Sequence, residues 1–381
     1  MIEGGNPTSR SEALALARWL ETAVNAHDVA ALTDRYAENA VLISPVFRET
    51  VGRAAIRRSW EEIFNRFPDW QVKTLELLVD GDRLAFVGTC TATDRNGWFG
   101  LPPTGETFSY RAVILLTLRD DKIVRDQRMY DLTSVLEHLE KTQVDRELKT
   151  AGQVQSALLS RRLQTGEHYE AFGDSIACRT IGGDFYEALE LPSGDLGIVL
   201  GDVAGKGPPA ALLAAMLQGM FTVEGRIAST PRRALANANA VLSAKPLAPR
   251  FATLVYGVLS RDGNFTYSNA GHNPPILLGG SGIRHCEIGG PLLGAFRDTA
   301  FEEQTLRTEP GDALVLFTDG VIESRNAAGE EFGEERMVCC VESLRRRSAV
   351  EIATGLLDAV REFSCRAAPD DDITVAVVRR L

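Results

Sequence analysis

The sequence has few of the features that mark a zinc protein, a secreted protein or a nucleic-acid binder. Its six cysteines among 381 residues form no Cys-x-x-Cys pair, which argues against a zinc site and a disulfide scaffold. A formal net charge of -11 argues against general binding to nucleic acid. No apolar run reaches membrane-spanning length, and no signal peptide is recognisable at the start. We therefore expect reduced cysteines and a cytoplasmic location.

Internal repeats and low-complexity tracts are also missing, and the composition is that of a globular protein, with 44% apolar and 24% charged residues. A chain of 381 residues is too long for one ordinary core, so two domains are expected. The pattern changes twice along the chain. These changes predict an N-terminal domain over residues 8–138, a linker helix over 139–165 and a C-terminal domain over 166–381.

The N-terminal segment shows helices first and strands second. Leu14, Ala17, Leu20 and Val24 recur at helical spacing after a Ser11 cap. Further helices are expected over 28–36 and 54–64, and a strand over 40–43. Consecutive strands are expected over 72–79, 83–93, 107–118 and 122–130, because apolar residues recur there between turn signals. This order predicts an α+β domain.

Over about residues 11–139, this order and three short phrases resemble the SnoaL-like branch of the NTF2-like superfamily. The phrases are Tyr36-Ala37-Glu38-Asn39-Ala40-Val41, Gly52-Arg53-Ala54-Ala55-Ile56 and Met129-Tyr130-Asp131-Leu132. The resemblance implies a cone with an apolar pocket, which some members use for catalysis and others for sensing a ligand. We expect a sensor for a small molecule. The alternative is a second enzyme, with Asp69, Tyr130 and Asp131 near its pocket.

The segment from Ser134 to about Leu163 has little Gly or Pro and no strand pattern, so it predicts a helix. Its apolar positions step by four and three, as in a coiled-coil seam, at Val144, Leu148, Ala151, Gln155 and Leu158. Two interpretations stay open, since the seam is short. The helix either joins two copies in a homodimer and transmits a signal, or it packs on its own domain.

Four short aspartate motifs distinguish the C-terminal half, each next to a strand-like run. They are Gly182-Gly183-Asp184, Gly201-Asp202-Val203, Thr318-Asp319-Gly320 and Asp370-Asp371-Asp372-Ile373-Thr374. Any single aspartate could serve a turn. Together they predict a cluster of hard oxygen ligands for Mn²⁺ or Mg²⁺, and two such ions sharing Asp202 could activate water against a phosphate ester. Thr374 is expected to point outward from the strand that follows.

The glycine loop after Asp202 invites a competing interpretation as a nucleotide phosphate loop. That interpretation fails on spacing, because Gly207 stands where Ser or Thr would hold magnesium. The segment Asn269-Ala270-Gly271-His272 is also marked. His272 is either a general acid for the leaving oxygen or, as the turn residues favour, part of a tight hydrogen-bonded turn.

In order along the chain, these motifs resemble the SpoIIE/RsbU branch of the PPM (PP2C-like) serine/threonine phosphatases. The phrases that carry the resemblance are Gly182-Gly183-Asp184-Phe185-Tyr186, the run from Gly201 to Gly207, Asn269-Ala270-Gly271-His272, the run from Phe317 to Glu323 and Asp371-Asp372-Ile373-Thr374. The match covers about residues 147–381. It implies a two-sheet sandwich flanked by helices, with two Mn²⁺ or Mg²⁺ ions between the sheets.

By motif, the resemblance assigns the metal ligands to Asp184, Asp202, Asp319, Asp371 and the Val203 carbonyl, with Asp184 and Asp202 as the catalytic pair. Activated water would attack phosphorus in line without a phospho-enzyme. The implied substrate is a phosphorylated STAS-type anti-sigma-factor antagonist. Lys206, Arg179 and His272 are candidate substrate contacts.

The chain departs from the branch at Ala204, where Ser is usual, and at Glu187, where Asp is usual. Neither position is one of the four carboxylate ligands. A catalytically weak binding module that keeps the fold is the remaining alternative, and its mark would be missing ligands.

Overall fold

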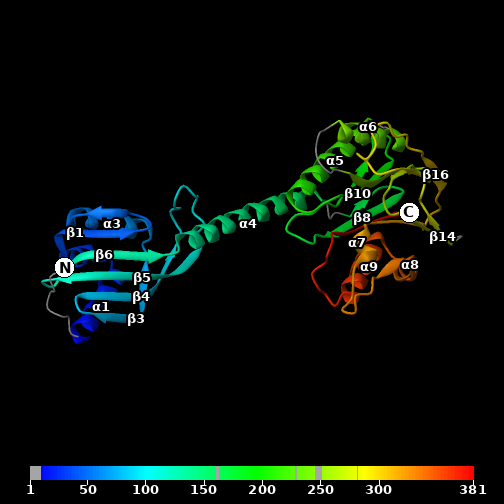
Figure 1. Ribbon diagram of the computed structural model, residues 1–381. Coiled ribbons are helices and arrows are strands. Elements are labelled where there is room, and N and C mark those ends of the chain that lie inside the picture. Colours follow the sequence, from blue (N-terminus) through cyan, green and yellow to red (C-terminus); the bar gives the residue numbers. More distant parts are fainter. Residues whose placement is uncertain (1–9, 160–162, 228–229, 245–250, 281) are drawn as a thin grey trace. The chain divides into compact units, whose positions relative to one another are not determined.

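The structure is a computed structural model that describes residues 10–159, 163–227, 230–244, 251–280 and 282–381. The chain divides into two compact units, Met1–Glu147 and Leu148–Leu381 (Figure 1). This division falls inside the segment predicted as a linker helix, residues 139–165. None of the helices in the described part of the chain combines the length and the apolar character needed to cross a lipid bilayer.

The described part of the N-terminal unit contains three complete helices and a six-stranded sheet, in the predicted order. The helices are α1 (Arg10–Asn25), α2 (Val29–Asp34) and α3 (Arg53–Arg66), and the strands are β1 (Tyr36–Ser44), β2 (Arg48–Val51), β3 (Gln71–Asp80), β4 (Arg83–Thr93), β5 (Thr107–Arg119) and β6 (Lys122–Tyr130). The sheet order is β2-β1-β6-β5-β4-β3. Only the β1–β6 pair among these neighbours is parallel.

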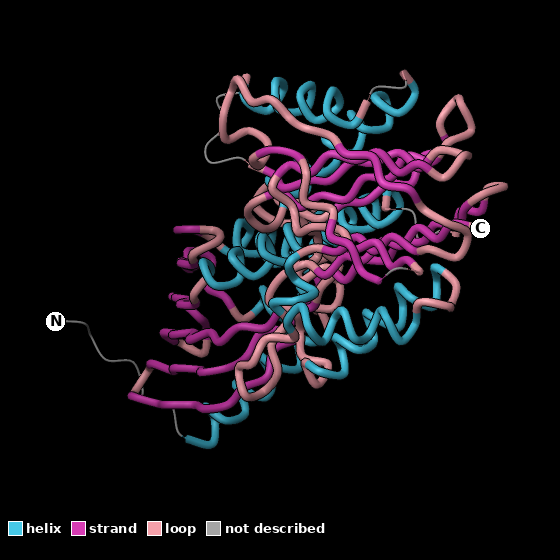
Figure 2. Tube along the Cα trace, turned by 90° about the vertical axis from the view of Figure 1, so that its right-hand side faces the viewer, coloured by secondary structure: helices cyan, strands magenta, loops and turns pink. Residues whose placement is uncertain are grey.

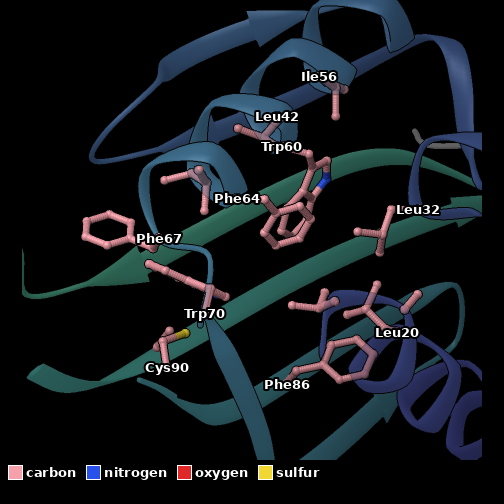
Figure 3. Packing of buried hydrophobic residues seen from close by; sticks show 14 of the residues in the cluster. Leu20, Leu32, Leu42, Ile56, Trp60, Phe64, Phe67, Trp70, Phe86 and Cys90 are labelled. Atoms are coloured by element: carbon pink, nitrogen blue, oxygen red, sulfur yellow. The ribbon is translucent and has the colours of Figure 1, made fainter. Parts of the chain in front are cut away.

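The sheet wraps an aromatic core, because one face of each strand turns inward. Strand β4 alternates buried and half-buried residues from Leu84 to its end. Trp60 and Phe64 of α3 stack with ring centroids 5.3 Å apart, and Phe67 and Trp70 extend the cluster (Figure 3). The α+β architecture predicted from the sequence is confirmed for this unit.

Helix α4 (Leu132–Leu158) follows β6 and confirms the predicted helix. Its first turns bury Val135 and Leu139. Val144 and Leu158, two positions of the predicted seam, are 54% and 49% exposed. Gln155, a third seam position, hydrogen-bonds the backbone of Gly182 in its own unit. This bond matches the interpretation in which the helix packs on its own domain, while pairing between copies stays a prediction.

The C-terminal unit is a sandwich of two sheets. The first has the order β15-β12-β11-β10-β9, with β16 beside β12, and the second has the order β14-β13-β17-β18-β8-β7. The strands of the first are β9 (Phe185–Glu190), β10 (Leu196–Val203), β11 (Ala252–Leu259), β12 (Asn264–Ala270), β15 (Gly289–Gly290) and β16 (Gln304–Arg307). Those of the second are β7 (Gln164–Thr165), β8 (Tyr169–Ile176), β13 (Ile276–Gly279), β14 (Gly282–His285), β17 (Ala313–Phe317) and β18 (Ile373–Arg380).

Helices cover the outer faces of both sheets (Figure 2). They are α5 (Pro208–Arg226), α6 (Pro231–Ser243), α7 (Asp319–Glu323), α8 (Gly333–Leu344) and α9 (Ala349–Phe363). Helices α5 and α6 pack on the first sheet, and α8 and α9 on the second. Between the sheets, Leu200 and Val255 meet Leu316 and Ala376 in a third core. The predicted two-sheet sandwich flanked by helices is thus confirmed.

Some predicted boundaries were wrong. The sequence pattern predicts a strand over residues 174–179, whereas β8 begins earlier, at Tyr169, and ends at Ile176. Helices α7 and α8 and several short strands were not predicted. The sequence around α7 reads as a turn because Asp319 and Gly320 open it.

Candidate metal centre

The four predicted aspartates come from two places in each sheet. In the first sheet, Asp184 directly precedes β9 and Asp202 lies near the end of β10. These strands are antiparallel neighbours, with Gly201 opposite Phe185. In the second sheet, Asp319 follows β17 and Asp371 precedes β18, again antiparallel neighbours. Pairing therefore places two carboxylates at the same end of each sheet.

Side-chain hydrogen bonds join the two sheets at this end. Asp184 Oδ2 accepts from Thr318 Oγ1 at 2.9 Å and from Thr374 Oγ1 at 2.5 Å. All three residues are buried. The expectation that Thr374 points outward was wrong, because β18 is covered on one face by α9 and on the other by the first sheet. Both threonines fix the orientation of a predicted metal ligand.

The carboxylates lie close enough together to raise one another's pKa. Burial first, and then the charges of Asp319, Asp371 and Asp372, together raise the pKa of Asp202 to about 7, although a hydrogen bond with Asp184 lowers it. Burial and then the charge of Asp202 raise the pKa of Asp184. Burial and then Asp371 raise the pKa of Asp319. The structure thus brings the four predicted carboxylates into one electrostatic cluster.

Asp372 was not predicted as a site residue, and it holds the loops around the cluster. Its Oδ1 accepts from the backbone N–H of Cys178 at 2.8 Å, and its Oδ2 from that of Gly183 at 2.7 Å. Cys178, Asp371 and Asp372 bring one ligand atom each within 4.8 Å of one another. Because both residues lie in one acidic run, no sequence pattern distinguishes the structural Asp372 from its neighbour Asp371.

Backbone packing beside Asp202 depends on a glycine. A Cβ atom at Gly183 would lie 2.7 Å from the Val203 carbonyl oxygen and 3.4 Å from Asp202 Oδ1. The Val203 N–H also donates to the Gly183 carbonyl at 3.3 Å. The Val203 carbonyl therefore lies beside the cluster, and its role as a metal ligand stays a prediction.

Lys206 reaches the same cluster from the glycine loop. Its Nζ lies 3.0 Å from Asp371 Oδ2 and also donates to the Asp370 carbonyl. Gly205 and Gly207 have φ values of 103° and 79°, so the loop turns where other residues would be strained.

Arg179 and His272, the other two candidate substrate contacts, take no part in the hydrogen bonds described above. Arg179 is exposed, in the segment after β8. His272 is buried, its N–H donates to Asn269 Oδ1 at 2.7 Å, and its Nδ1 lies 2.8 Å from Thr253 Oγ1. Burial lowers the pKa of His272 to about 4, so the imidazole is neutral at pH 7. These contacts match the expected hydrogen-bonded turn. Substrate contact by Arg179 or His272 stays a prediction.

The donor set suits hard divalent cations. Mn²⁺ and Mg²⁺ prefer carboxylate, carbonyl and water oxygens. Crowded carboxylates repel one another, and this repulsion is relieved either by protons or by cations. The raised pKa of Asp202 is the mark of such a cluster.

A pH dependence follows for the chelator-treated protein. Because the folded chain raises the pKa of Asp202 from about 3.9 in unfolded chains to about 7, folding favours the protonated carboxyl. The free energy of unfolding should therefore fall by a few kcal/mol as the pH rises from 4 to 7. Urea unfolding in EDTA at several pH values measures this fall. Saturating Mn²⁺ should cancel it, and an equal fall in Asp202→Asn would contradict the assignment to this group.

Comparison with known families agrees with the arrangement of these motifs. Residues 192–381 match the model of stage II sporulation protein E (SpoIIE). This part of the chain belongs to the SpoIIE family. The match includes Asp202, Asp319 and Asp371, while Asp184 lies just before it. Residues 16–126 match the SnoaL-like domain model. The chain thus combines a SnoaL-like domain with a SpoIIE-type, PP2C-like domain.

Two curated relatives share the SpoIIE-type part. The chain is 28% identical over 251 residues to phosphoserine phosphatase RsbU of Bacillus subtilis, covering 62% of this chain and 71% of RsbU. It is 29% identical over 267 residues to protein IcfG of Synechocystis sp., covering 61% of this chain and 41% of IcfG. The chain therefore spans less than half of IcfG.

Among solved structures, the SiaA-PP2C domain of Pseudomonas aeruginosa has the same fold. It is 21% identical, with a TM-score of 0.55, and the match covers 63% of this chain and 98% of that domain. This likeness supports the sandwich architecture of the SpoIIE-type domain.

Proposed function

We propose that this protein is a metal-dependent protein serine/threonine phosphatase whose N-terminal domain is a sensor. The observation that carries the proposal is the meeting of Asp184, Asp202, Asp319 and Asp371 at one end of the two sheets. Family membership of residues 192–381 and similarity to a phosphoserine phosphatase support the same chemistry.

The residues of the site would have three separate roles: holding the ions, orienting a ligand and contacting the phosphoryl group. Asp202, in contact with Asp184 and near the other two carboxylates, would hold two Mn²⁺ or Mg²⁺ ions together with them and the Val203 carbonyl. When bound, the ions would supply a Lewis acid for the phosphoryl oxygens and for the attacking water. Thr318 and Thr374 orient Asp184. Lys206, exposed beside Asp371, is placed to meet the negative charge of a phosphoryl group.

The proposed substrate is a phosphoserine or phosphothreonine in a STAS-domain protein of a partner-switching pathway, in the cytoplasm. The substrate proposal comes from the resemblance to the SpoIIE/RsbU branch and from similarity to RsbU. A homodimer through α4 belongs to the same proposal, since two seam positions of that helix are half exposed.

The proposal is tested by release of inorganic phosphate. The purified chain with Mn²⁺ should release phosphate from a phosphoserine STAS protein, but not from a matched phosphotyrosine peptide. Addition of EDTA should stop the release. A chain that binds the phosphorylated STAS protein without releasing phosphate would instead be the catalytically weak binding module.

The structure gives little support to a second enzyme in the N-terminal domain. Asp69 Oδ1 accepts from the Thr93 N–H at 3.1 Å, and Asp131 accepts from the first N–H groups of α4. Of the three expected residues, only Tyr130 lines the cavity of this domain. The aspartates serve turns and a helix start, so sensing is the better supported role.

Gln155 connects the linker helix to the loop that precedes Asp184. Its Nε2 donates to the Gly182 carbonyl at 2.8 Å, and its Oε1 accepts from the Gly182 N–H at 3.1 Å. Gly182 is two residues from Asp184. We propose that the sensor acts by shifting α4, because a shift of Gln155 would move this loop.

Gln155→Ala should therefore raise the Mn²⁺ concentration needed for half-maximal activity by about tenfold, since a lost pair of hydrogen bonds corresponds to about 1–2 kcal/mol. Titration of phosphatase activity with Mn²⁺ measures this change. Gln153→Ala, at an exposed position on the same helix, is the control and should leave the curve unchanged. The same Mn²⁺ dependence of activity in both variants would show that Gln155 has no role in the regulation.

A further inference from the structure

The N-terminal unit contains a cavity, as the SnoaL-like resemblance implies, and the residues of its wall indicate what kind of ligand fits it. The space open to the centres of water-sized spheres is about 60 Å³, several times the ~10–15 Å³ that one water needs. Its wall comes from α1, α3 and the strands of the sheet, all within this unit. The wall is rich in aromatic rings, contributed by Tyr36, Phe47, Trp60, Trp70, Phe86, Tyr110 and Tyr130.

The positive charge of this wall is already paired. Among the described residues that line the cavity, Arg128 is the only one with a cationic side chain. Its Nη2 donates to Asp126 Oδ2 at 2.8 Å, and its Nε lies 3.2 Å from both oxygens of that carboxylate. The Tyr36 hydroxyl donates to the same Asp126 oxygen at 2.6 Å. The Arg128 guanidinium also lies 4.3 Å from the ring centre of Trp60. Arg128 is therefore already paired with Asp126 and packed against Trp60, so it is not available to an anionic ligand.

The remaining carboxylate of the wall is also engaged. Glu21 Oε2 accepts from the Thr74 N–H at 2.9 Å. With Arg128 paired to Asp126, the wall keeps one net negative charge at Glu21, which disfavours an anionic ligand further. A cationic ligand would leave water for a wall whose one carboxylate without a cation partner, Glu21, already accepts a hydrogen bond from the backbone.

One buried donor in the wall lacks an acceptor. Trp60 is 6% exposed, and its Nε1 has no hydrogen-bond partner in the described part of the chain. It lies near enough to the Tyr36 hydroxyl to influence that group, without the geometry of a hydrogen bond. Tyr130 and Tyr110 line the same wall, with Tyr130 near Ser44 and Tyr110 near Cys90. A buried unpaired N–H is costly, and a ligand oxygen would satisfy it.

We propose that this cavity binds a small, uncharged aromatic molecule that presents an acceptor oxygen to Trp60 Nε1. Ring walls favour a flat apolar body, because stacked and edge-on ring contacts add to the burial of area. Paired charges disfavour ions, because an ion buried without a partner is costly. The unpaired indole N–H of Trp60 determines where the acceptor oxygen of the ligand lies. Control of the phosphatase by this ligand rests on the proposed function, whereas the binding does not.

Four probes of nearly one shape test the proposal: acetophenone, its acceptor-free analogue α-methylstyrene, the anion benzoate and the cation benzamidine. Binding to the full-length chain is followed by ligand-observed NMR without turnover. Acetophenone should bind at least about tenfold more tightly than benzoate or benzamidine, and about three- to tenfold more tightly than α-methylstyrene, as one net hydrogen bond implies. Equal or tighter binding of either ion, or no binding of acetophenone at millimolar concentration, would overturn the proposal.

Substitutions locate the polar contact. Trp60→Phe should remove the preference for acetophenone over α-methylstyrene. Trp19→Phe, in the same unit but outside the cavity wall, should keep it. If Trp60→Phe does not fold, Ala112→Leu serves instead, because it fills the cavity from β5 and should abolish binding of both neutral probes. Retention of the acetophenone preference in Trp60→Phe, or of binding in a folded Ala112→Leu, would contradict the assignment.

The binding and the phosphatase proposals fail separately. Loss of acetophenone binding with normal phosphate release would refute the cavity ligand alone. Normal binding without phosphate release under any metal condition would refute the phosphatase and leave the ligand site standing.

Discussion

Asp202→Asn should lower the rate of phosphate release by about 10³-fold or more. Asp202 hydrogen-bonds Asp184, and the charges of Asp319, Asp371 and Asp372 raise its pKa. It is therefore the carboxylate best placed to hold cations together with the others. Metal ions contribute several kcal/mol to the stabilisation of a phosphoryl transition state, and each 1.36 kcal/mol is a factor of ten in rate. Single-turnover release of phosphate from a phosphoserine STAS protein measures the loss.

The same variant should fold at least as well as the wild-type chain in EDTA. Asparagine has the shape of aspartate, and it removes a charge that the folded state disfavours. Asp262→Asn is the matched control, since Asp262 is an exposed turn residue in the same unit. It should keep full activity. Near-normal turnover in Asp202→Asn would show that Asp202 is not a bridging ligand.

Gly183→Ala should cost both stability and metal affinity. Its Cβ would lie 2.7 Å from the Val203 carbonyl oxygen, too close for any real contact, and 3.4 Å from Asp202 Oδ1. Both neighbours belong to the predicted ligand set, and the carbonyl is backbone that cannot swing away. Overpacking of this kind costs about 1–3 kcal/mol. We expect unfolding at lower urea and at least about tenfold weaker Mn²⁺ binding.

Gly219→Ala is the control for this change of one methyl group. Gly219 lies in α5 of the same unit, and a Cβ there would meet nothing within 4 Å. Alanine in an exposed helix interior is favoured over glycine by about 0.5–1 kcal/mol, so this variant should be slightly more stable and bind Mn²⁺ normally. If both variants behaved alike, the close approach of Gly183 to the metal centre would be of no consequence.

The aspartate motifs could be predicted because each stands at the end of an apolar run. Strand ends at one edge of a sheet lie together, so several such motifs point to one site. The residues that orient the ligands could not be predicted in this way. Thr318 and Thr374 look like ordinary strand-end residues, and their role arises only when the second sheet packs on the first and presents both hydroxyls to Asp184.

The different roles of Asp371 and Asp372 in the acidic run also could not be predicted from the sequence. Asp371 and Asp372 are adjacent and identical, yet a strand start turns alternate side chains to opposite sides. One then faces Lys206 and the other faces the N–H groups of Cys178 and Gly183. Gln155 had the spacing of a seam residue, and only its long-range contact with Gly182 shows that it faces its own domain.

In the N-terminal unit, strands β4 and β6 matched the sequence pattern, since alternation and turn signals agree there. The buried network did not follow from the pattern. Asp126 and Arg128 are two apart on β6, so both point inward, and charged residues at such positions ordinarily predict a solvent face. Their mutual pairing and the Tyr36 hydroxyl explain how the core holds them.

The central claim is that four carboxylates from two sheets hold a pair of divalent cations. Isothermal titration calorimetry of Mn²⁺ into the chelator-treated chain tests it most directly. We predict two Mn²⁺ ions per chain, with proton release near neutral pH as Asp202 gives up its proton, and loss of both ions in Asp202→Asn. No saturable Mn²⁺ binding by the folded wild-type chain, or equal binding by Asp202→Asn, would contradict the claim.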